Sequence, residues 1–173
     1  MKYIKYSTLL VFLAAVIYSC EKDDICAETT VTTPHLLIDF FDINAPDEAK
    51  NVRLLTVIGE DLTAPIVFNS STSSIALPLR FQDEDAITTT RFELIKDTDY
   101  DTDENETTAS NTDVFEITYT PQFIYVSRAC GYKSIFNDAQ ITIEQDTENW
   151  AISFDIINST IENENEAHIN IYH

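Results

Sequence analysis

Three cysteines, Cys20, Cys26 and Cys130, are the side chains of this 173-residue chain with the widest choice of chemistry. A thiol can carry an acyl chain, pair in a disulfide, bind a metal ion or act as a nucleophile. Which of these applies depends on the compartment that the chain reaches and on the residues that flank each sulfur. The segment before Cys20 indicates the compartment, and the positions of the later cysteines indicate which chemistry their flanking residues allow.

Residues 1–19 have the layout of a secretory signal. Two lysines are followed by an apolar stretch from Leu9 to Tyr18 and then by the small residue Ser19. A helix needs about 20 apolar residues to cross a bilayer, and this stretch is about half as long. We therefore predict that residues 1–19 are a removable signal peptide, and the alternative is a permanent anchor helix.

The four residues Ile17-Tyr18-Ser19-Cys20 resemble a bacterial lipobox, whose cysteine receives diacylglycerol and becomes the first residue of the mature chain. The resemblance implies that Cys20 is lipidated, rather than being an ordinary thiol near a cleavage site. Residues 20–32 would then be the lipidated cysteine and its tether. Two or three acyl chains hold a protein stably on a membrane, whereas one chain is marginal. The predicted membrane contact is therefore lipid.

Lys22, Asp23 and Asp24 follow the first cysteine directly. This triplet resembles the export signal of surface lipoproteins in Bacteroidetes-type bacteria. The resemblance implies a lipid-anchored protein of the outer membrane that faces the outside of the cell. Any short solvated segment can also carry such charges without being an export signal. The alternative is therefore a periplasm-facing position.

Cys26 and Cys130 remain after Cys20 is assigned to lipid. Exported chains reach a compartment where thiols oxidise, so an even pair of cysteines favours a disulfide between Cys26 and Cys130. A zinc site is disfavoured, because neither cysteine has a second ligand at the usual spacing. The remaining alternative is a reactive thiol at Cys130, whose pKa Arg128 and Lys133 could lower.

The sequence "DTDYDTDENETTASNT", residues 97–112, is the one long irregular and acidic segment. Its aspartates alternate as calcium ligands do, but Thr102 stands where a calcium loop counted from Asp97 needs glycine, and Thr108 stands where it needs glutamate. We expect a solvated hairpin tip, with adventitious calcium binding as the alternative. We predict no metal or cofactor for the chain.

No catalytic motif can be recognised from local spacing, so we predict no catalytic residues and no enzyme activity. Alternation places His168, Asn170 and Tyr172 on one face of a last strand, as an exposed face or a polar recognition strip. The aromatic residues Phe123, Tyr125 and Tyr132 are expected to pack in the core around the disulfide, with a groove lining as the alternative. These are the other candidate site residues.

The mature chain would be strongly acidic. Loss of residues 1–19 removes two of the ten basic residues and leaves all thirty acidic ones, so the net charge becomes −22. Nucleic-acid partners are disfavoured, because phosphates require a basic surface. A chain of about 150 residues can bury one core, and we assign residues 33–173 to a single domain.

Apolar residues alternate with polar ones along much of that domain, which is typical of half-buried strands. The clearest alternation is that of Ile75, Leu77, Leu79 and Phe81, of Phe115, Ile117 and Tyr119, and of Trp150, Ile152, Phe154 and Ile156. Other short strands are predicted at 36–41, 52–58, 66–68, 91–95, 123–127, 141–144 and 167–172. A single helical turn is expected at 45–51, and Pro78 is expected at an edge strand or at its start. Eight to ten strands predict an all-β antiparallel sandwich, immunoglobulin-like or a related Greek key.

The order of the lipobox cysteine, "DDIC", "TTPHLLIDF", "SIALPL" and "RACGYKSIF" is similar to that of uncharacterised Bacteroidetes lipoproteins. That resemblance implies the location and the cysteine pairing, but no reaction. We therefore expect a non-enzymatic envelope lipoprotein that contacts another envelope protein or an extracellular ligand. A glycan-binding accessory module would need two or three coplanar exposed aromatic rings. An enzyme would need a cleft with two converging carboxylates, or with one carboxylate and His168.

Overall fold

The computed structural model describes residues 25–27, 30, 32–98 and 109–173. Their contacts define two compact units. The smaller unit contains Tyr125–Tyr132 and the described residues up to Thr30. The larger unit contains the described residues of Val31–Ile124 together with Lys133–His173. Each unit is described by itself below.

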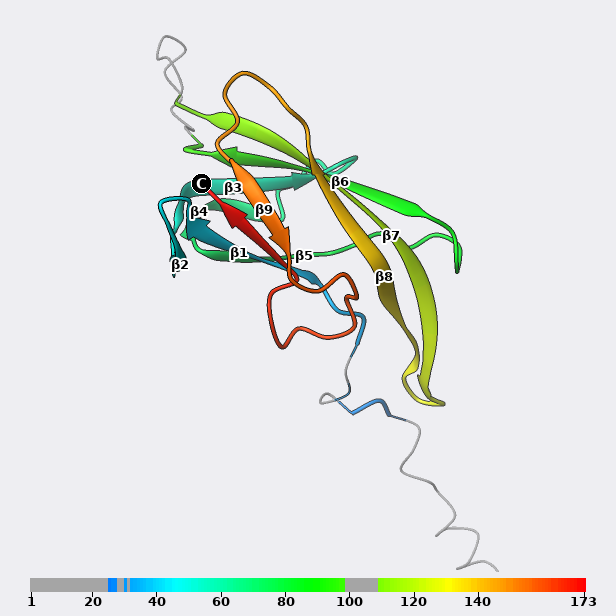
Figure 1. Ribbon diagram of the computed structural model, residues 1–173. Coiled ribbons are helices and arrows are strands. Elements are labelled where there is room, and N and C mark those ends of the chain that lie inside the picture. The colour runs from blue at the N-terminus through cyan, green and yellow to red at the C-terminus, as the bar shows by residue number, and fades with distance from the viewer. Residues whose placement is uncertain (1–24, 28–29, 31, 99–108) are drawn as a thin grey trace, which may run out of the picture. The chain divides into compact units, whose positions relative to one another are not determined.

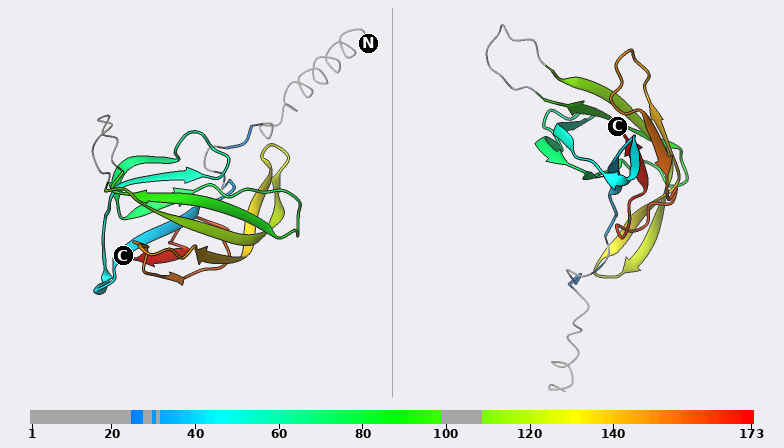
Figure 2. Two further views of the ribbon diagram at one scale, coloured as in Figure 1. Left: turned by 90° about the horizontal axis from the view of Figure 1, so that it is seen from above. Right: turned by 60° about the vertical axis from the view of Figure 1, so that its left-hand side comes forward.

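The described chain forms ten strands and no helix, which confirms the predicted all-β sandwich (Figure 1). Sheet A has the order β2 (Ala45–Ala49), β1 (Leu36–Asp42), β10 (Ile169–Tyr172) and β9 (Ser153–Ile156), and β5 (Ser74–Leu77) also pairs with β1. Sheet B has the order β4 (Val67–Thr72), β3 (Val52–Gly59), β6 (Thr88–Lys96), β7 (Asn111–Ser127) and β8 (Gly131–Ile143). Viewed from above, β1 and β10 lie in one layer and β6 and β7 in another (Figure 2).

The first and last strands of sheet A pair in parallel, which the predicted antiparallel arrangement did not include. Ile38 is opposite Ile169, and Phe40 is opposite Ile171. The other strand pairs whose register is defined are antiparallel, and β6 and β7 pair without a break from Thr88 opposite Tyr119 to Lys96 opposite Asn111. A parallel pair needs a long connection, and here nearly the whole domain lies between the two strands.

The core lies between the two sheets. It is built from the inward positions of the alternating strands, such as Leu36, Ile38 and Phe40 of β1 and Phe115 and Ile117 of β7, all fully buried. Trp150 joins the two layers. Its ring lies 6.1 Å from that of Phe40 in sheet A and 6.5 Å from that of Phe115 in sheet B, and its indole N–H donates to the Leu94 carbonyl oxygen at 3.2 Å.

The helical turn predicted at 45–51 is wrong, because Ala45–Ala49 is the edge strand β2. Ala49 pairs with Phe41 and Ala45 pairs with Asp42 around a bulge. Although the residues of this segment are compatible with a helix, they pair with β1 as a strand. Pro46 is tolerated, because an edge strand has one side without a ladder partner. Pro78 lies outside the strand that was predicted to contain it, because β5 ends at Leu77, but β5 pairs only with β1 among the described strands and is therefore an edge strand, as predicted.

Two apolar residues lie on the opposite side from the predicted one. Phe81 is 60% exposed, since β5 ends at Leu77 and the alternation stops beyond Leu79. Ile152 is 61% exposed while its neighbour Ala151 is buried, because β9 begins only at Ser153. Residues 150–152 therefore belong to a loop that enters the core, and their side chains do not alternate between the two faces of a sheet as those of a strand would.

Alanine substitutions at Trp150 and Ile152 test which of these two side chains lies in the core. Trp150→Ala should lower the free energy of unfolding by about 3–5 kcal/mol, because it removes a ring packed between the sheets. Ile152→Ala should change it by less than about 0.5 kcal/mol, because that side chain is exposed. Urea denaturation measures both. Similar losses for the two variants would show that Ile152 is packed in the core.

Candidate functional site

The smaller unit contains a disulfide between Cys26 and Cys130, as predicted. The two sulfur atoms are 2.01 Å apart and the two Cα atoms 4.8 Å apart. The Cys130 backbone N–H donates to the Ser127 hydroxyl oxygen at 3.0 Å within the connection from β7 to β8. Because its sulfur is bonded, Cys130 is neither a free nucleophile nor a zinc ligand. Cys20 and the predicted export signal Lys22-Asp23-Asp24 lie outside the described residues.

The aromatic residues near the disulfide are not in the core, so that prediction is wrong. Tyr125 is 58% exposed and Tyr132 is 70% exposed, and their rings meet at 68° with centroids 5.4 Å apart. Phe123, in the larger unit, is partly buried and packs edge-on against exposed Phe81 at 6.3 Å. Neither pair is coplanar, so neither forms the flat platform that a glycan-binding module would need.

The start of β1 is fixed by hydrogen bonds from distant parts of the larger unit. The Ser134 backbone N–H donates to the Thr33 hydroxyl oxygen at 2.9 Å. Glu164 accepts from both the backbone N–H and the ring Nδ1 of His35, each at 2.7 Å. These bonds lower the pKa of the Glu164 carboxyl below its ordinary value. The arrangement secures the chain where it enters the sheet.

His168 is buried, so the predicted polar strip of His168, Asn170 and Tyr172 does not form an exposed face. The Leu37 backbone N–H donates to His168 Nδ1 at 3.0 Å, and Nε2 lies 3.1 Å from the Asn163 carbonyl oxygen. A neutral ring that carries its proton on Nε2 satisfies both contacts. Burial lowers the pKa of His168, and the nearby carboxylates of Glu164 and Glu166 oppose this in part. This histidine connects two backbone segments and is not among the residues that line the two clefts described below.

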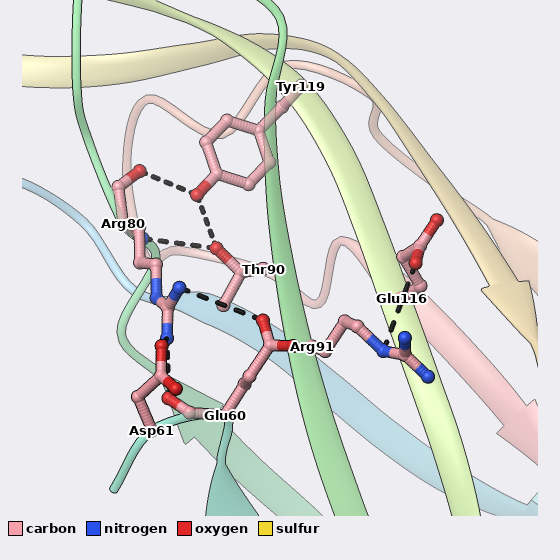
Figure 3. Close-up of polar contacts among 7 residues, drawn as sticks. All are labelled: Glu60, Asp61, Arg80, Thr90, Arg91, Glu116 and Tyr119. Atoms are coloured by element: carbon pink, nitrogen blue, oxygen red, sulfur yellow. Dashed lines mark hydrogen bonds and ion pairs between the residues drawn. The ribbon is translucent and has the colours of Figure 1, made fainter.

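A closed set of hydrogen bonds fixes Arg80 against sheet B (Figure 3). The Arg80 backbone N–H donates to the Thr90 hydroxyl oxygen at 3.2 Å, Thr90 and Tyr119 share a bond of 2.6 Å, and the Tyr119 hydroxyl donates to the Arg80 carbonyl oxygen at 2.5 Å. Thr90 therefore donates to Tyr119. Burial raises the pKa of the Tyr119 hydroxyl, which keeps it a donor. The sequence predicted Tyr119 as an inward residue, and a buried tyrosine hydroxyl needs a partner, but the partner could not be identified.

The side chain of Arg80 reaches the turn after β3. Its guanidinium donates to the Glu60 carbonyl oxygen at 2.5 Å and to the Asp61 carboxylate at 3.2 Å, and it lies 3.7 Å from the Glu60 carboxylate (Figure 3). Asp61 has φ 64°, a left-handed conformation that aspartate tolerates better than most residues. A second arginine, Arg91, contacts Glu144 at 2.9 Å.

Two clefts flank this turn and share its residues Gly59, Glu60, Asp61 and Leu62. The larger has a volume of about 540 Å³ and is also lined by Arg91, Phe92 and Glu93 on β6 and by Val114 on β7. The smaller, of about 240 Å³, has Arg80 and Thr90 in its wall. The larger volume is in the usual range for a small-molecule site. This is the candidate binding cleft of the described residues.

The larger cleft is lined by charged side chains that form ion pairs. Its carboxylates are those of Glu60, Asp61 and Glu93, and the first two converge on the Arg80 guanidinium. Neither cleft has a histidine, cysteine or serine among the described residues that line it. A Cβ at Gly59 would lie 3.0 Å from the end of the Leu62 side chain, which is exposed and would have to shift slightly. The arrangement can bind a small polar ligand, and its side chains do not form a nucleophile–base pair.

The side chains of the described residues also bear on metal binding. Within residues 25–27, 30, 32–98 and 109–173, no group of three or more His, Cys, Asp or Glu is arranged to hold a metal ion. The calcium alternative concerns residues 97–112, of which 99–108 lie outside the description. In the same described ranges no helix is long and apolar enough to cross a membrane.

The fold and its cleft define a disulfide-bonded two-sheet β protein with an ion-paired turn. Residues 54–173 match the family of unknown function DUF6452, and the chain belongs to that family. No curated protein and no solved structure matches the chain.

The buried position of His168 predicts a loss of stability in mild acid. Its folded-state pKa lies below the ordinary value of 6.5, so the unfolded chain takes up the proton first and stability falls as the pH drops through this region. The melting temperature of the native protein should therefore fall more steeply between pH 7.5 and 5.5 than that of His168→Gln, which has no proton to gain. Parallel pH profiles for the two proteins would contradict the buried neutral ring.

Removing one hydroxyl tests the bonds around Arg80. Tyr119→Phe leaves the Arg80 carbonyl oxygen and the Thr90 hydroxyl without their shared partner, which should cost about 1–3 kcal/mol of unfolding free energy. Tyr132→Phe is the matched control, because it removes an exposed hydroxyl, and it should change stability by less than about 0.5 kcal/mol. Equal small effects in urea denaturation would mean that the Tyr119 hydroxyl is not needed in this network.

Proposed function

We propose that the mature protein is a cell-envelope lipoprotein, anchored by lipid on Cys20, which presents the β-sandwich as a non-enzymatic binding or structural module. The observation that carries the proposal is the disulfide between Cys26 and Cys130. Structural disulfides form and persist in oxidising compartments, so the bond supports export. Export in turn supports interpreting residues 1–19 as a signal and Cys20 as the first residue of the mature chain.

The distribution of the cysteines supports separate roles for them. Cys26 follows Cys20 by six residues and is bonded to a residue 104 positions further on. In the entropic model, closing a loop of about 100 residues stabilises a fold by about 4.7 kcal/mol. A lipid on Cys20 would thus be linked through a short tether to a point that is covalently fixed. That arrangement suits a module that must remain folded at a membrane surface.

The contact that this module makes with a ligand or partner protein would use the cleft beside the β3–β4 turn. Arg91 and the carboxylates of Glu60, Asp61 and Glu93 line the larger cleft, and Arg80 lines the smaller one from the connection between β5 and β6, all within the larger unit. The strong negative charge of the chain disfavours nucleic acid and favours a neutral or cationic partner, such as another envelope protein. Lys22-Asp23-Asp24 would direct the protein to the outer face of the outer membrane.

Fractionation of producing cells tests the anchor. The native protein should be found in the membrane fraction and released by detergent, whereas Cys20→Ala should lose the acyl mass and leave that fraction. Cys26→Ser is the control, because it alters a nearby cysteine without touching the lipid. A Cys20→Ala variant that stays membrane-bound would rule out the lipid anchor.

Protease treatment of intact cells tests the orientation separately. The native protein should be digested if it faces outward, and Lys22→Ala should be protected while remaining lipidated. Protection of the native protein would place it on the periplasmic side and would reject the role of Lys22-Asp23-Asp24 as a surface signal.

A further inference from the structure

The smaller unit exposes apolar and aromatic side chains around its disulfide. Ile25 is 84% exposed, Tyr132 70% and Tyr125 58%, and the two tyrosine rings pack against each other. Tyrosine has an apolar ring and a polar hydroxyl, which suits it to the boundary between lipid and water. Large contiguous apolar patches of this chemistry are typical of contact surfaces, whereas single exposed apolar side chains are not.

The end of the hairpin that carries the two tyrosines contains no acidic residue of its own, and among the hydrogen bonds of the described residues the Glu84 carboxylate meets this stretch only at the Phe123 backbone N–H. The chain has thirty acidic residues, but none lies between Glu116 and Asp138, and this stretch contains two basic residues, Arg128 and Lys133. Residues 62–82 form another acid-free stretch of equal length, so it is the covalent link to the anchor, together with this local charge, that singles out the hairpin end. Carboxylates would oppose contact with an apolar or anionic surface, so their absence from the chain around Tyr125 and Tyr132 favours such a contact there, whereas Ile25 lies between Asp24 and Glu28.

The covalent structure limits how far this cluster can be from the anchor. Six residue steps separate Cys20 from Cys26, and at about 3.6 Å per residue they span at most about 22 Å. The Cα atom of Cys130 lies a further 4.8 Å from that of Cys26. A lipid on Cys20 therefore holds the hairpin end within about 27 Å of the bilayer surface, less than the thickness of a bilayer core.

We propose that Ile25, Tyr125 and Tyr132, around the Cys26–Cys130 disulfide, form a membrane-docking surface that rests on the phospholipid bilayer carrying the anchor. This inference rests on the proposed lipid anchor and adds a second, protein-mediated contact to it. The tether keeps the cluster close to the bilayer, so even a weak interfacial contact is populated because of its high effective concentration.

The contact is made by aromatic and aliphatic side chains rather than by charge. The segment next to the anchor includes Glu21, Asp23, Asp24 and Glu28, which do not favour an anionic surface. Insertion of tyrosine and isoleucine into the interface does not require anionic lipid. Docking should therefore occur on zwitterionic phosphatidylcholine and should persist at high salt.

Fluorescence quenching by brominated lipid tests the docking directly. The full lipidated protein is purified in detergent and reconstituted into phosphatidylcholine vesicles with or without brominated acyl chains. The native protein supplies the background from its single tryptophan, Trp150, which is buried. After its subtraction, Tyr132→Trp should lose about half of its emission to brominated lipid, because interfacial indoles lie close to the acyl chains.

The matched control is Ile152→Trp, a substitution at a similarly exposed position of the larger unit. It should show little quenching. Equal quenching of both variants would overturn the assignment to this hairpin. Tyr125→Trp is the second probe should Tyr132→Trp fail to form the disulfide, which mass analysis without reductant detects.

The remaining outcomes separate the docking from the anchor. Vesicle flotation and the acyl mass report the anchor, and quenching reports the docking. A protein that floats with vesicles but shows no quenching of Tyr132→Trp overturns the docking and leaves the anchor intact. A protein without acyl mass that does not float overturns both. A blue shift of Tyr132→Trp emission that depends on protein concentration, without quenching, assigns the surface to a second copy of the chain and also overturns the bilayer as its occupant.

Discussion

The parallel pairing of β1 with β10 is the constraint on which the larger unit depends. β1 supplies three fully buried core residues, Leu36, Ile38 and Phe40, and its neighbours in sheet A are β2, β5 and β10. The pairing continues beyond the strands themselves, because the His168 N–H donates to the Leu37 carbonyl oxygen and the His173 N–H to that of Phe41. Residues from the two ends of the larger unit thus form one ladder.

That ladder also positions the residues between the sheets. Phe40 contacts the rings of both Trp150 and His173, so the end of the chain is part of the same aromatic group that reaches Phe115 in sheet B. Burial keeps the pKa of His173 below its ordinary value, as it does for His168. The histidines that bracket β10 are therefore structural groups, and the candidate binding cleft lies on sheet B, around the turn after β3.

The local sequence was sufficient to predict those strands in which apolar and polar residues alternate regularly. Phe115, Ile117 and Tyr119 were predicted to point inward and do so, and the even pair of cysteines left by the expected lipidation of Cys20 predicted the disulfide. The failures share a cause, which is that a distant partner decides the structure. The helical turn at 45–51 is a strand because β1 is beside it, and the parallel register of β1 and β10 has no local signal.

The same limit applies to the candidate sites. The Tyr119 hydroxyl was recognisable as a buried polar group, but its partner Arg80 lies 39 residues earlier, so only the fold identifies it. The exposed positions of Tyr125 and Tyr132 could not be derived from alternation, which gives two faces but not where a hairpin leaves the core. Because β10 pairs with β1, a chain synthesised from its amino end cannot complete sheet A until residues 169–172 have emerged.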